Sequence, residues 1–155
     1  MTKTDPVIRT IMAPIPGRWL LLPNNVVTEV LGYQSLVQYE HGPAWLMGEM
    51  EWNSWQVPVI SFAELTNIAR RDPASSSSRI LVVKSLSEDV SLYYIGILIN
   101  GLPKLNSLRE SALEDCEKTL DSPVIFQEVK VGDKEAIIPD LKALAQTVSA
   151  AVYDH

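Results

Sequence analysis

Few side chains in this sequence are of the kinds that perform covalent chemistry, and those present are not spaced to act together. The histidines are His41, in a stretch with the composition of a turn, and His155, the final residue. The single cysteine, Cys116, could form a nucleophilic pair with His41, but its acidic neighbours disfavour the thiolate that such a pair needs. We expect both histidines to face solvent and no residue to be catalytic.

An acidic cluster is the other candidate for chemistry, here the binding of a cation. It consists of Glu110, Glu114, Asp115 and Glu117. A hard cation requires several oxygen atoms on a tight loop with a glycine turn, and this cluster has no such loop. We interpret the cluster as the solvated face of a helix. Motifs for phosphate, zinc or acyl-transfer sites are also missing, so the sequence predicts neither an enzyme nor a bound metal or cofactor.

Composition limits the function further. The chain has 155 residues, 46% of them hydrophobic, which is enough to bury the core of one domain. A net charge of -6 argues against nucleic acid or an anionic membrane surface as partner and leaves proteins. One cysteine suits a reducing compartment, and Arg9, Pro14 and Pro16 interrupt the first apolar stretch, so we expect a cytoplasmic protein without direct membrane insertion.

Short apolar or alternating runs bounded by turn residues occupy most of the chain, which is typical of a β-barrel or sandwich. The predicted strands are 7–12, 18–22, 26–31, 45–52, 55–60, 79–83, 92–99, 124–131 and 134–138. Helix is predicted only as a minority element, so the expected fold class is mainly β.

Two hairpins can be predicted in detail. A two-residue turn at Asn53 and Ser54 sets Trp52 opposite Trp55 and leaves an apolar face along both strands. That face favours core packing for the two tryptophans, while their place near a turn also allows a protein interface. The second hairpin turns at 132–133 and sets Lys130 opposite Glu135 as a cross-strand ion pair.

Helix starts are indicated in three places. Ser61 with Glu64 has the spacing of a capping box before a short helix through Ile68, and Ser107 with Glu110 repeats that spacing. Near the end of the chain, Asp140 can cap an amphipathic helix over 140–153. Its apolar face is predicted to contain Leu141, Leu144, Ala145, Val148 and Val152.

The polar, serine-rich run 72–78 is the one linker-like segment. It suggests that one domain spans 1–155, with 7–71 mostly in a first lobe and 79–138 mostly in a second lobe and in return strands. No internal repeat is visible in the sequence.

Three stretches resemble the signature of the CheW domain in order and spacing. They are residues 27–33 (Val-Thr-Glu-Val-Leu-Gly-Tyr), 43–48 (Pro-Ala-Trp-Leu-Met-Gly) and 57–60 (Val-Pro-Val-Ile). The strands at 79–83 and 94–100 and the closing hairpin and helix from 131 to 141 are similar to later parts of the family. The resemblance implies two small SH3-like β-barrels packed together, with short helices and a C-terminal amphipathic helix.

The resemblance also implies a signalling adaptor that links the regulatory domain of a CheA-type histidine kinase to the cytoplasmic tip of methyl-accepting chemoreceptors. Within the family, the chain looks most like the ChpC type of accessory protein, from the chemosensory system of type IV pili and twitching motility. Recruitment to membrane-associated receptor arrays would follow.

Two sets of site residues are carried over from the family. The kinase-binding set consists of Glu29, Leu31, Tyr33 and Leu36; Leu31 and Tyr33 are the expected hot spots, and Val30 is expected to fill the core. The receptor-binding set consists of Trp52, Asn53, Ser54 and Trp55.

The sequence departs from the family pattern at the receptor-binding hairpin. Asn53 stands in the turn where the family has a receptor-contacting arginine, and Ser61 and Asn100 replace two family aspartates. An asparagine cannot form the bidentate, charge-assisted contact of arginine with a carboxylate, so we expect weaker receptor binding or a different receptor class.

Three alternatives stay open on the sequence alone. The chain could bind a kinase without coupling it to receptors. It could be a β-barrel that encloses a small ligand, which would require a dry cavity in a wide barrel. It could also be an enzyme that uses Cys116, which a thiol reagent would inactivate.

Overall fold

The computed structural model describes residues 6–86, 92–116 and 119–153. Its strands are β1 (Val7–Ile15), β2 (Arg18–Pro23), β3 (Val27–Gly32), β4 (Leu46–Trp52), β5 (Trp55–Ile60), β6 (Arg79–Lys84), β7 (Tyr94–Ile99), β8 (Lys104–Arg109), β9 (Leu113–Asp115), β10 (Ile125–Val131) and β11 (Lys134–Pro139). The helices are α1 (Phe62–Leu65), α2 (Leu141–Tyr153) and the 3-10 turns η1 (Asn24–Val26) and η2 (Glu110–Ala112). The mainly β fold class is confirmed.

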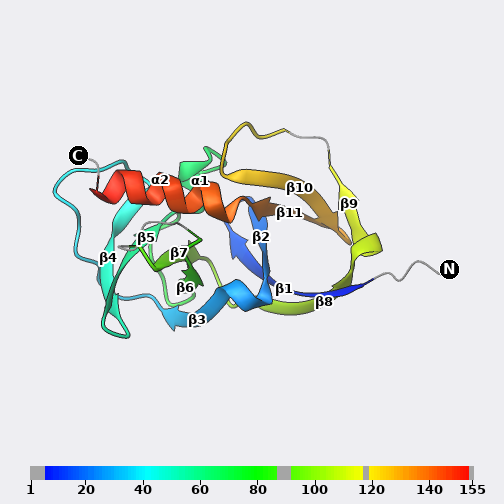
Figure 1. Cartoon of the computed structure of the whole chain (residues 1–155), viewed down its shortest axis with the longest axis horizontal. Coiled ribbons are helices and arrows are strands. Elements are labelled where there is room, and N and C mark those ends of the chain that lie inside the picture. Colours follow the sequence, from blue (N-terminus) through cyan, green and yellow to red (C-terminus); the bar gives the residue numbers. More distant parts are fainter. Residues whose placement is uncertain (1–5, 87–91, 117–118, 154–155) are drawn as a thin grey trace.

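The strands form two curled sheets that lie side by side, with α2 across them (Figure 1). Sheet A has the strand order β8-β1-β2-β11-β10-β9, and sheet B has the order β3-β6-β7-β5-β4. All pairs are antiparallel except β2 with β11 in sheet A and β5 with β7 in sheet B. In sheet A the two edge strands, β8 and β9, are joined by only the three residues of η2, so the sheet must curl to bring its edges together.

The two sheets share one topology, although no repeat is visible in the sequence. The hairpins β1–β2 and β6–β7 correspond, and each is extended by a parallel strand, β11 or β5, that forms a second hairpin with β10 or β4. In sheet A, the short strand β9 pairs with the outer edge of β10. In sheet B, the isolated bridge of Val37 with Glu49 lies at the equivalent edge of β4. Both parallel strands then lead into a capped helix: the Ser61 hydroxyl accepts from the Glu64 amide, and the Asp140 carboxylate accepts from the Ala143 amide.

The order of strands along the chain differs from the predicted lobes. The serine-rich run does not separate the two sheets, because sheet B takes β3 to β7 from both sides of that run, and sheet A takes its strands from the first and last parts of the chain. The run 72–78 joins α1 to β6 within one half of the molecule. The linker-like composition therefore marks an exposed loop and not a boundary between lobes.

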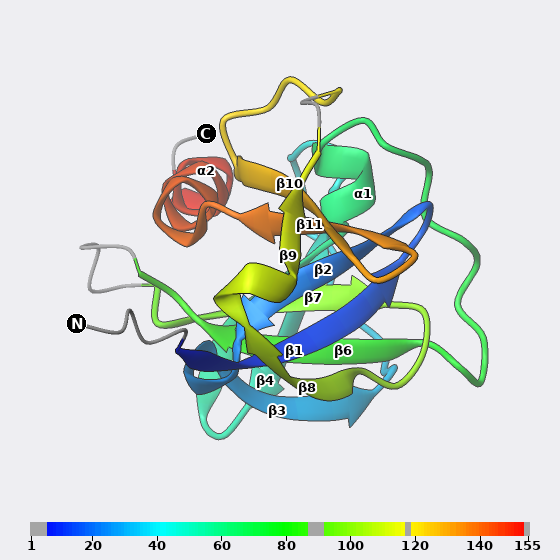
Figure 2. The same ribbon diagram turned by 90° about the vertical axis from the view of Figure 1, so that its right-hand side faces the viewer.

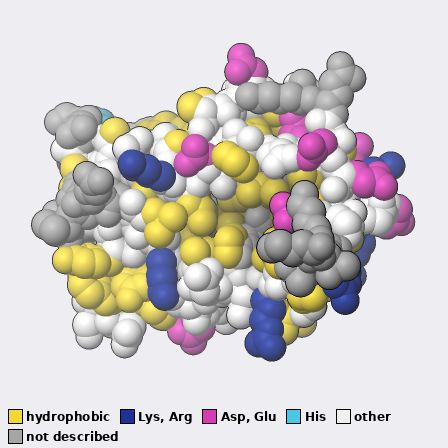
Figure 3. All heavy atoms as spheres, turned by 45° about the vertical axis from the view of Figure 1, so that its right-hand side comes forward, with side chains coloured by type: hydrophobic (Ala, Val, Ile, Leu, Met, Phe, Trp, Pro, Cys, Tyr) yellow, Lys and Arg dark blue, Asp and Glu magenta, His cyan; other side chains and the backbone are white. Residues whose placement is uncertain are grey.

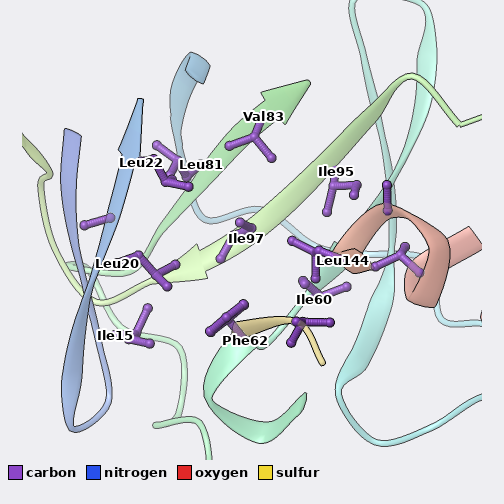
Figure 4. Packing of buried hydrophobic residues seen from close by; sticks show 14 of the residues in the cluster. Ile15, Leu20, Leu22, Ile60, Phe62, Leu81, Val83, Ile95, Ile97 and Leu144 are labelled. Atoms are coloured by element: carbon purple, nitrogen blue, oxygen red, sulfur yellow. The ribbon is translucent and has the colours of Figure 1, made fainter. Parts of the chain in front are cut away.

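The core between the sheets is the largest apolar cluster. Side chains of β1 and β2 meet those of β5, β6 and β7, and both α1 and α2 contribute; Figure 4 shows Ile15, Leu20, Leu22, Ile60, Phe62, Leu81, Val83, Ile95, Ile97 and Leu144. Each sheet also encloses a smaller cluster of its own, around Met50, Val57 and Val59 in sheet B and around Met12, Leu21 and Val129 in sheet A. Leu144, Ala145 and Val148 of α2 are buried, as the helical pattern predicts.

One predicted helix is wrong. Ser107 lies within β8, and Glu110 begins the turn η2, which leads directly into β9. The acidic cluster is thus not on a helix: Glu114 and Asp115 lie in β9, and Glu117 lies outside the described residues. A capping-box spacing is a local signal, and pairing of β8 with β1 over Val7 to Met12 determines the structure here.

Both predicted hairpins have the expected register. Trp52 faces Trp55, with positive φ at Asn53 (50°) and Ser54 (66°), and Lys130 faces Glu135 beyond a turn with Gly132 at φ 62°. The predicted ion pair is wrong, because Glu135 binds Arg18 of β2 instead, at 3.0 Å. The parallel pairing of β11 with β2 is what brings this competitor close.

Candidate protein-binding surface

The two predicted sets of site residues both belong to sheet B and are in contact through one hydrogen bond. Glu29 is exposed on the edge strand β3, and Trp52 ends β4 at the opposite edge of the same sheet. The indole Nε1 of Trp52 donates a hydrogen bond of 2.6 Å to Oε2 of Glu29. This bond joins the two edges of the curled sheet and connects one residue of each predicted set. We call the two predicted sets together the aromatic rim: Glu29, Leu31, Tyr33, Leu36, Trp52, Asn53, Ser54 and Trp55.

Aromatic rings support the hairpin of the rim. The ring of Trp52 packs edge-on against Tyr94, with centroids 4.9 Å apart. Trp55 lies on Tyr93 at 4.3 Å and also contacts Tyr94 at 5.8 Å. Such pairs stabilise beyond their buried area. Trp52 is therefore half-buried and anchored, whereas Trp55 remains 38% exposed on a fixed support.

The apolar residues of the kinase-binding set divide by burial. Leu31 and Leu36 are half-buried and pack against the core of sheet B, and Val30 packs against the core between the sheets. Tyr33 is 38% exposed, beside the exposed Gly32. Tyr33 is therefore more exposed than either leucine of this set.

The segment between β3 and β4 is fixed in position by backbone contacts. Val37 exchanges two backbone hydrogen bonds with Glu49, of 2.9 and 2.8 Å, and Gln34 donates from Nε2 to the sulfur of Met50. Gly48 makes this approach possible, because a Cβ atom there would lie 2.8 Å from the carbonyl oxygen of Val37. Leu36 is thus placed on the rim by strand pairing.

Hydrophobic side chains are exposed on the molecular surface near the hairpin of β4 and β5 (Figure 3). Figure 3 shows hydrophobic side chains at the lower left, where the hairpin of β4 and β5 protrudes. Exposed aromatic side chains on a rigid support are typical hot spots of protein interfaces. The rim can bind a protein through packing and hydrogen bonds, and its residues are not arranged for acid-base or nucleophilic chemistry.

Sequence analysis missed two contributors to this surface, Tyr93 and Tyr94. Both lie where β7 begins, and they contact the tryptophans across the sheet. The adjacent pair of tyrosines was a visible signal, but their contact with the hairpin depends on β7 lying beside β5 in parallel, which the sequence does not show.

The candidates for chemistry lie apart from the rim. Cys116 is half-buried next to Arg18 and Glu128, around a hollow of about 70 Å³, and His41 is exposed in the loop before β4. His155 lies outside the described residues. The structure therefore does not bring Cys116 and His41 together as a pair.

Glu128 is a buried carboxylate that sequence analysis did not single out. It is 7% exposed and accepts hydrogen bonds from the Thr119 amide and hydroxyl, both 2.8 Å, and from the Leu120 amide at 3.0 Å. Burial alone would raise the pKa of Glu128, but these donors, with Arg18 nearby, hold it below its usual value. The carboxylate fixes the loop between β9 and β10.

The fold and the rim define a class of protein: a two-sheet β protein with exposed aromatic side chains. Residues 9–149 match the CheW-like domain model, and the chain belongs to the family of CheW-like domains. No curated protein matches the sequence. Among solved structures, the chain is similar to the scaffolding protein TtCheW from Thermoanaerobacter tengcongensis, with 20% identity, a TM-score of 0.75 and coverage of 93% of this chain and 91% of that one.

That structural similarity supports the fold predicted from the sequence resemblance, including the helix at the end of the chain. In the part of the chain that the structure describes, no helix combines the length and apolar character required to cross a bilayer.

Proposed function

We propose that this protein is a non-enzymatic signalling adaptor that links a CheA-type histidine kinase to chemoreceptors in the cytoplasm, at membrane-associated receptor arrays. The observation that carries the proposal is the aromatic rim: accessible Tyr33 and Trp55 on a supported surface of a CheW-like fold. A surface of this kind suits protein binding, and the structurally similar TtCheW is a scaffolding protein.

The kinase-binding side of the rim would use Tyr33 as its main hot spot. Leu31 and Leu36 are half-buried, so they would hold the shape of the surface and add a smaller accessible area. Glu29 is held by Trp52 and would orient the partner more than it would add affinity. A homologous curled sheet of the kinase regulatory domain is the proposed partner.

The receptor-binding side would be the hairpin with Trp52, Asn53, Ser54 and Trp55. Asn53 is exposed at the tip but carries no charge, which supports weak receptor binding or a second candidate function, kinase binding without receptors. For the particular system we propose the ChpC type, serving type IV pili and twitching motility. The support for that assignment is the sequence resemblance.

The test is a binding titration of the purified protein against the regulatory domain of the kinase, with Tyr33→Ala, Trp55→Ala and Phe126→Ala variants. Phe126 is the matched control, because it is a 67% exposed aromatic residue on sheet A. We expect Tyr33→Ala to weaken kinase binding by about tenfold or more, and Phe126→Ala to change it less than about twofold.

Trp55→Ala should retain kinase binding and lose binding to a receptor signalling fragment. Absence of kinase binding by folded wild-type protein would reject the proposal. If Phe126→Ala weakened kinase binding as much as Tyr33→Ala does, the kinase interface would not be confined to the rim. Parallel titrations with the kinases of a pilus system and of a flagellar system test the proposed subtype, since only the former should bind tightly.

A further inference from the structure

The two tryptophans of the β4–β5 hairpin make different contacts, although they face each other across the turn. Trp55 is exposed and lies on Tyr93, whereas Trp52 is half-buried and donates its indole N–H to Glu29. Figure 2 shows β3, which carries Glu29, beside the tip of this hairpin at the lower side of the molecule. The family resemblance places Trp52 in the receptor-binding set, but its indole N–H binds a residue of the kinase-binding set.

The donor of this bond is fixed in place, and the acceptor is a flexible side chain. The ring of Trp52 packs edge-on against Tyr94, with centroids 4.9 Å apart, and against the core of sheet B. Glu29 is exposed on the edge strand β3 and forms no ion pair with the residues that the structure describes. Trp52 therefore restricts a carboxylate that water alone would leave free to sample several rotamers.

An indole donor orients the carboxylate without neutralising it. The N–H group of Trp52 carries no net charge, unlike the donors of lysine and arginine. The bond of 2.6 Å is to Oε2 of Glu29, and none of the described residues donates to Oε1. A carboxylate that is charged and already oriented suits a cationic group of a partner, because charge-assisted hydrogen bonds are strong and depend on geometry.

We propose that Trp52 is a positioning residue for kinase binding, which holds the Glu29 carboxylate in the orientation that meets a lysine or arginine of the kinase regulatory domain. This inference rests on the function proposed for the rim and gives the two facing tryptophans separate roles. Trp55 offers exposed area to a receptor, and Trp52 acts on the kinase side through Glu29. A carboxylate oriented before binding loses less rotamer freedom at the interface, so the bound state lasts longer.

The test measures the rates of association and dissociation between the full chain and the kinase regulatory domain by surface plasmon resonance. Trp52→Phe keeps an aromatic ring against Tyr94 but has no N–H donor, and Trp19→Phe makes the same change on sheet A as the matched control. We expect Trp52→Phe to speed dissociation about fivefold and to change association less than about twofold. Trp19→Phe should change either rate less than about twofold. Circular dichroism and thermal unfolding check the fold of both variants.

Two further variants test whether Trp52 acts through the carboxylate. Glu29→Gln removes the charge, so it should slow association and make binding less dependent on salt. In the Glu29→Gln background, Trp52→Phe should speed dissociation by less than about twofold. Glu29→Ala gives a readout without any partner: the indole N–H signal of Trp52 in the NMR spectrum of nitrogen-labelled protein should move upfield, because the bond to the carboxylate is lost.

The outcomes separate this inference from the function on which it rests. If folded wild-type protein did not bind the kinase, the proposed function would fall and this inference with it. If wild-type protein bound, but Trp52→Phe dissociated no faster than Trp19→Phe, or lost as much in the Glu29→Gln background as alone, only the role of Trp52 would be rejected. An indole signal unchanged by Glu29→Ala would also reject that role and leave kinase binding by the rim standing.

Discussion

Glu128 shows how one buried charge can organise a loop. Its carboxylate receives three hydrogen bonds from Thr119 and Leu120, which replace the water that solvates an exposed acid. Glu128 lies in β10 opposite Ile137 of β11, so its hydrogen bonds connect the loop to the hairpin β10–β11 of sheet A. Loss of the charge should therefore weaken sheet A as well as the loop.

We predict that Glu128→Gln lowers the free energy of unfolding at neutral pH by about 2 kcal/mol, since a neutral amide accepts these bonds less strongly. The folded-state pKa lies below the ordinary value of 4.5, so the contribution is complete above that value and is lost as pH falls through the folded pKa. Urea titrations from neutral to acid pH measure this. The difference between wild type and variant should shrink in acid, and a constant difference would contradict the prediction.

Residue roles were predictable where they are local. The turn at Asn53 and Ser54 was readable because positive φ and two-residue length are properties of the turn itself. The roles of Arg18 and Glu128 were not readable, because their partners lie in distant segments. The predicted pair of Lys130 and Glu135 failed for the same reason: local pairing was right, but a third strand supplied a better partner.

Gly48 controls the position of a whole segment. It lies in β4 at φ 145°, where side chains are strained, and a Cβ atom would lie 2.8 Å from the Val37 carbonyl oxygen and 2.9 Å from Cβ of Leu36. The backbone bonds of Val37 with Glu49 depend on this close approach. Gly48 thus connects the sheet to the side of the aromatic rim that we propose binds the kinase.

We predict that Gly48→Ala destabilises the fold by about 2 kcal/mol or more and shifts Leu36 off the sheet. Gly32→Ala is the control, because nothing lies within 4 Å of its added Cβ. Thermal unfolding measures stability, and amide exchange at Val37 and Glu49 measures the bridge. Equal stability and exchange in the two variants would show that the close approach is not required.

At the level of elements, the sequence was most informative where one face is buried. The alternating pattern of β4 and the apolar run of β6 gave strands close to the observed bounds. Strands β8 and β9 were missed because they are mostly exposed edge strands with a polar sequence. The sequence of an edge strand shows little alternation of buried and exposed residues. The capping-box spacing of Ser107 and Glu110 therefore led to a predicted helix where the structure has β8 and η2.

The shared core makes the two sheets one thermodynamic unit. Leu144 of α2 is fully buried in the cluster to which both sheets contribute. We predict that Leu144→Ala lowers the free energy of unfolding by about 2–5 kcal/mol and leaves a single transition, because neither sheet keeps its inner face covered without the other.

Tryptophan fluorescence and far-ultraviolet circular dichroism, followed together during denaturation, test this prediction. Trp19 lies in sheet A, and Trp52 and Trp55 lie in sheet B. Leu105→Ala is the control, since Leu105 is 65% exposed and should contribute less than about 0.5 kcal/mol. Two separated transitions would mean that the sheets unfold independently.

Placement of strands in sheets was the part of the fold that composition and periodicity could not supply. Local signals gave the elements, and the family resemblance gave the two-barrel architecture. The interleaving of the chain between sheets rests on parallel pairs such as β2 with β11, which join residues more than a hundred positions apart. No pattern within a short window reports such a pair.

That interleaving has a consequence for synthesis on the ribosome. Every strand of sheet B lies between Val27 and Ile99, so its ladder can form while the rest of the chain is still being made. Hairpin β1–β2 is made first, but its outer edges find their partners β8 and β11 only after residues 104–139 have been translated. The hairpin β1–β2 is therefore translated first and keeps both of its strand edges unpaired until near the end of synthesis. During that time these edges are open to pairing with other chains.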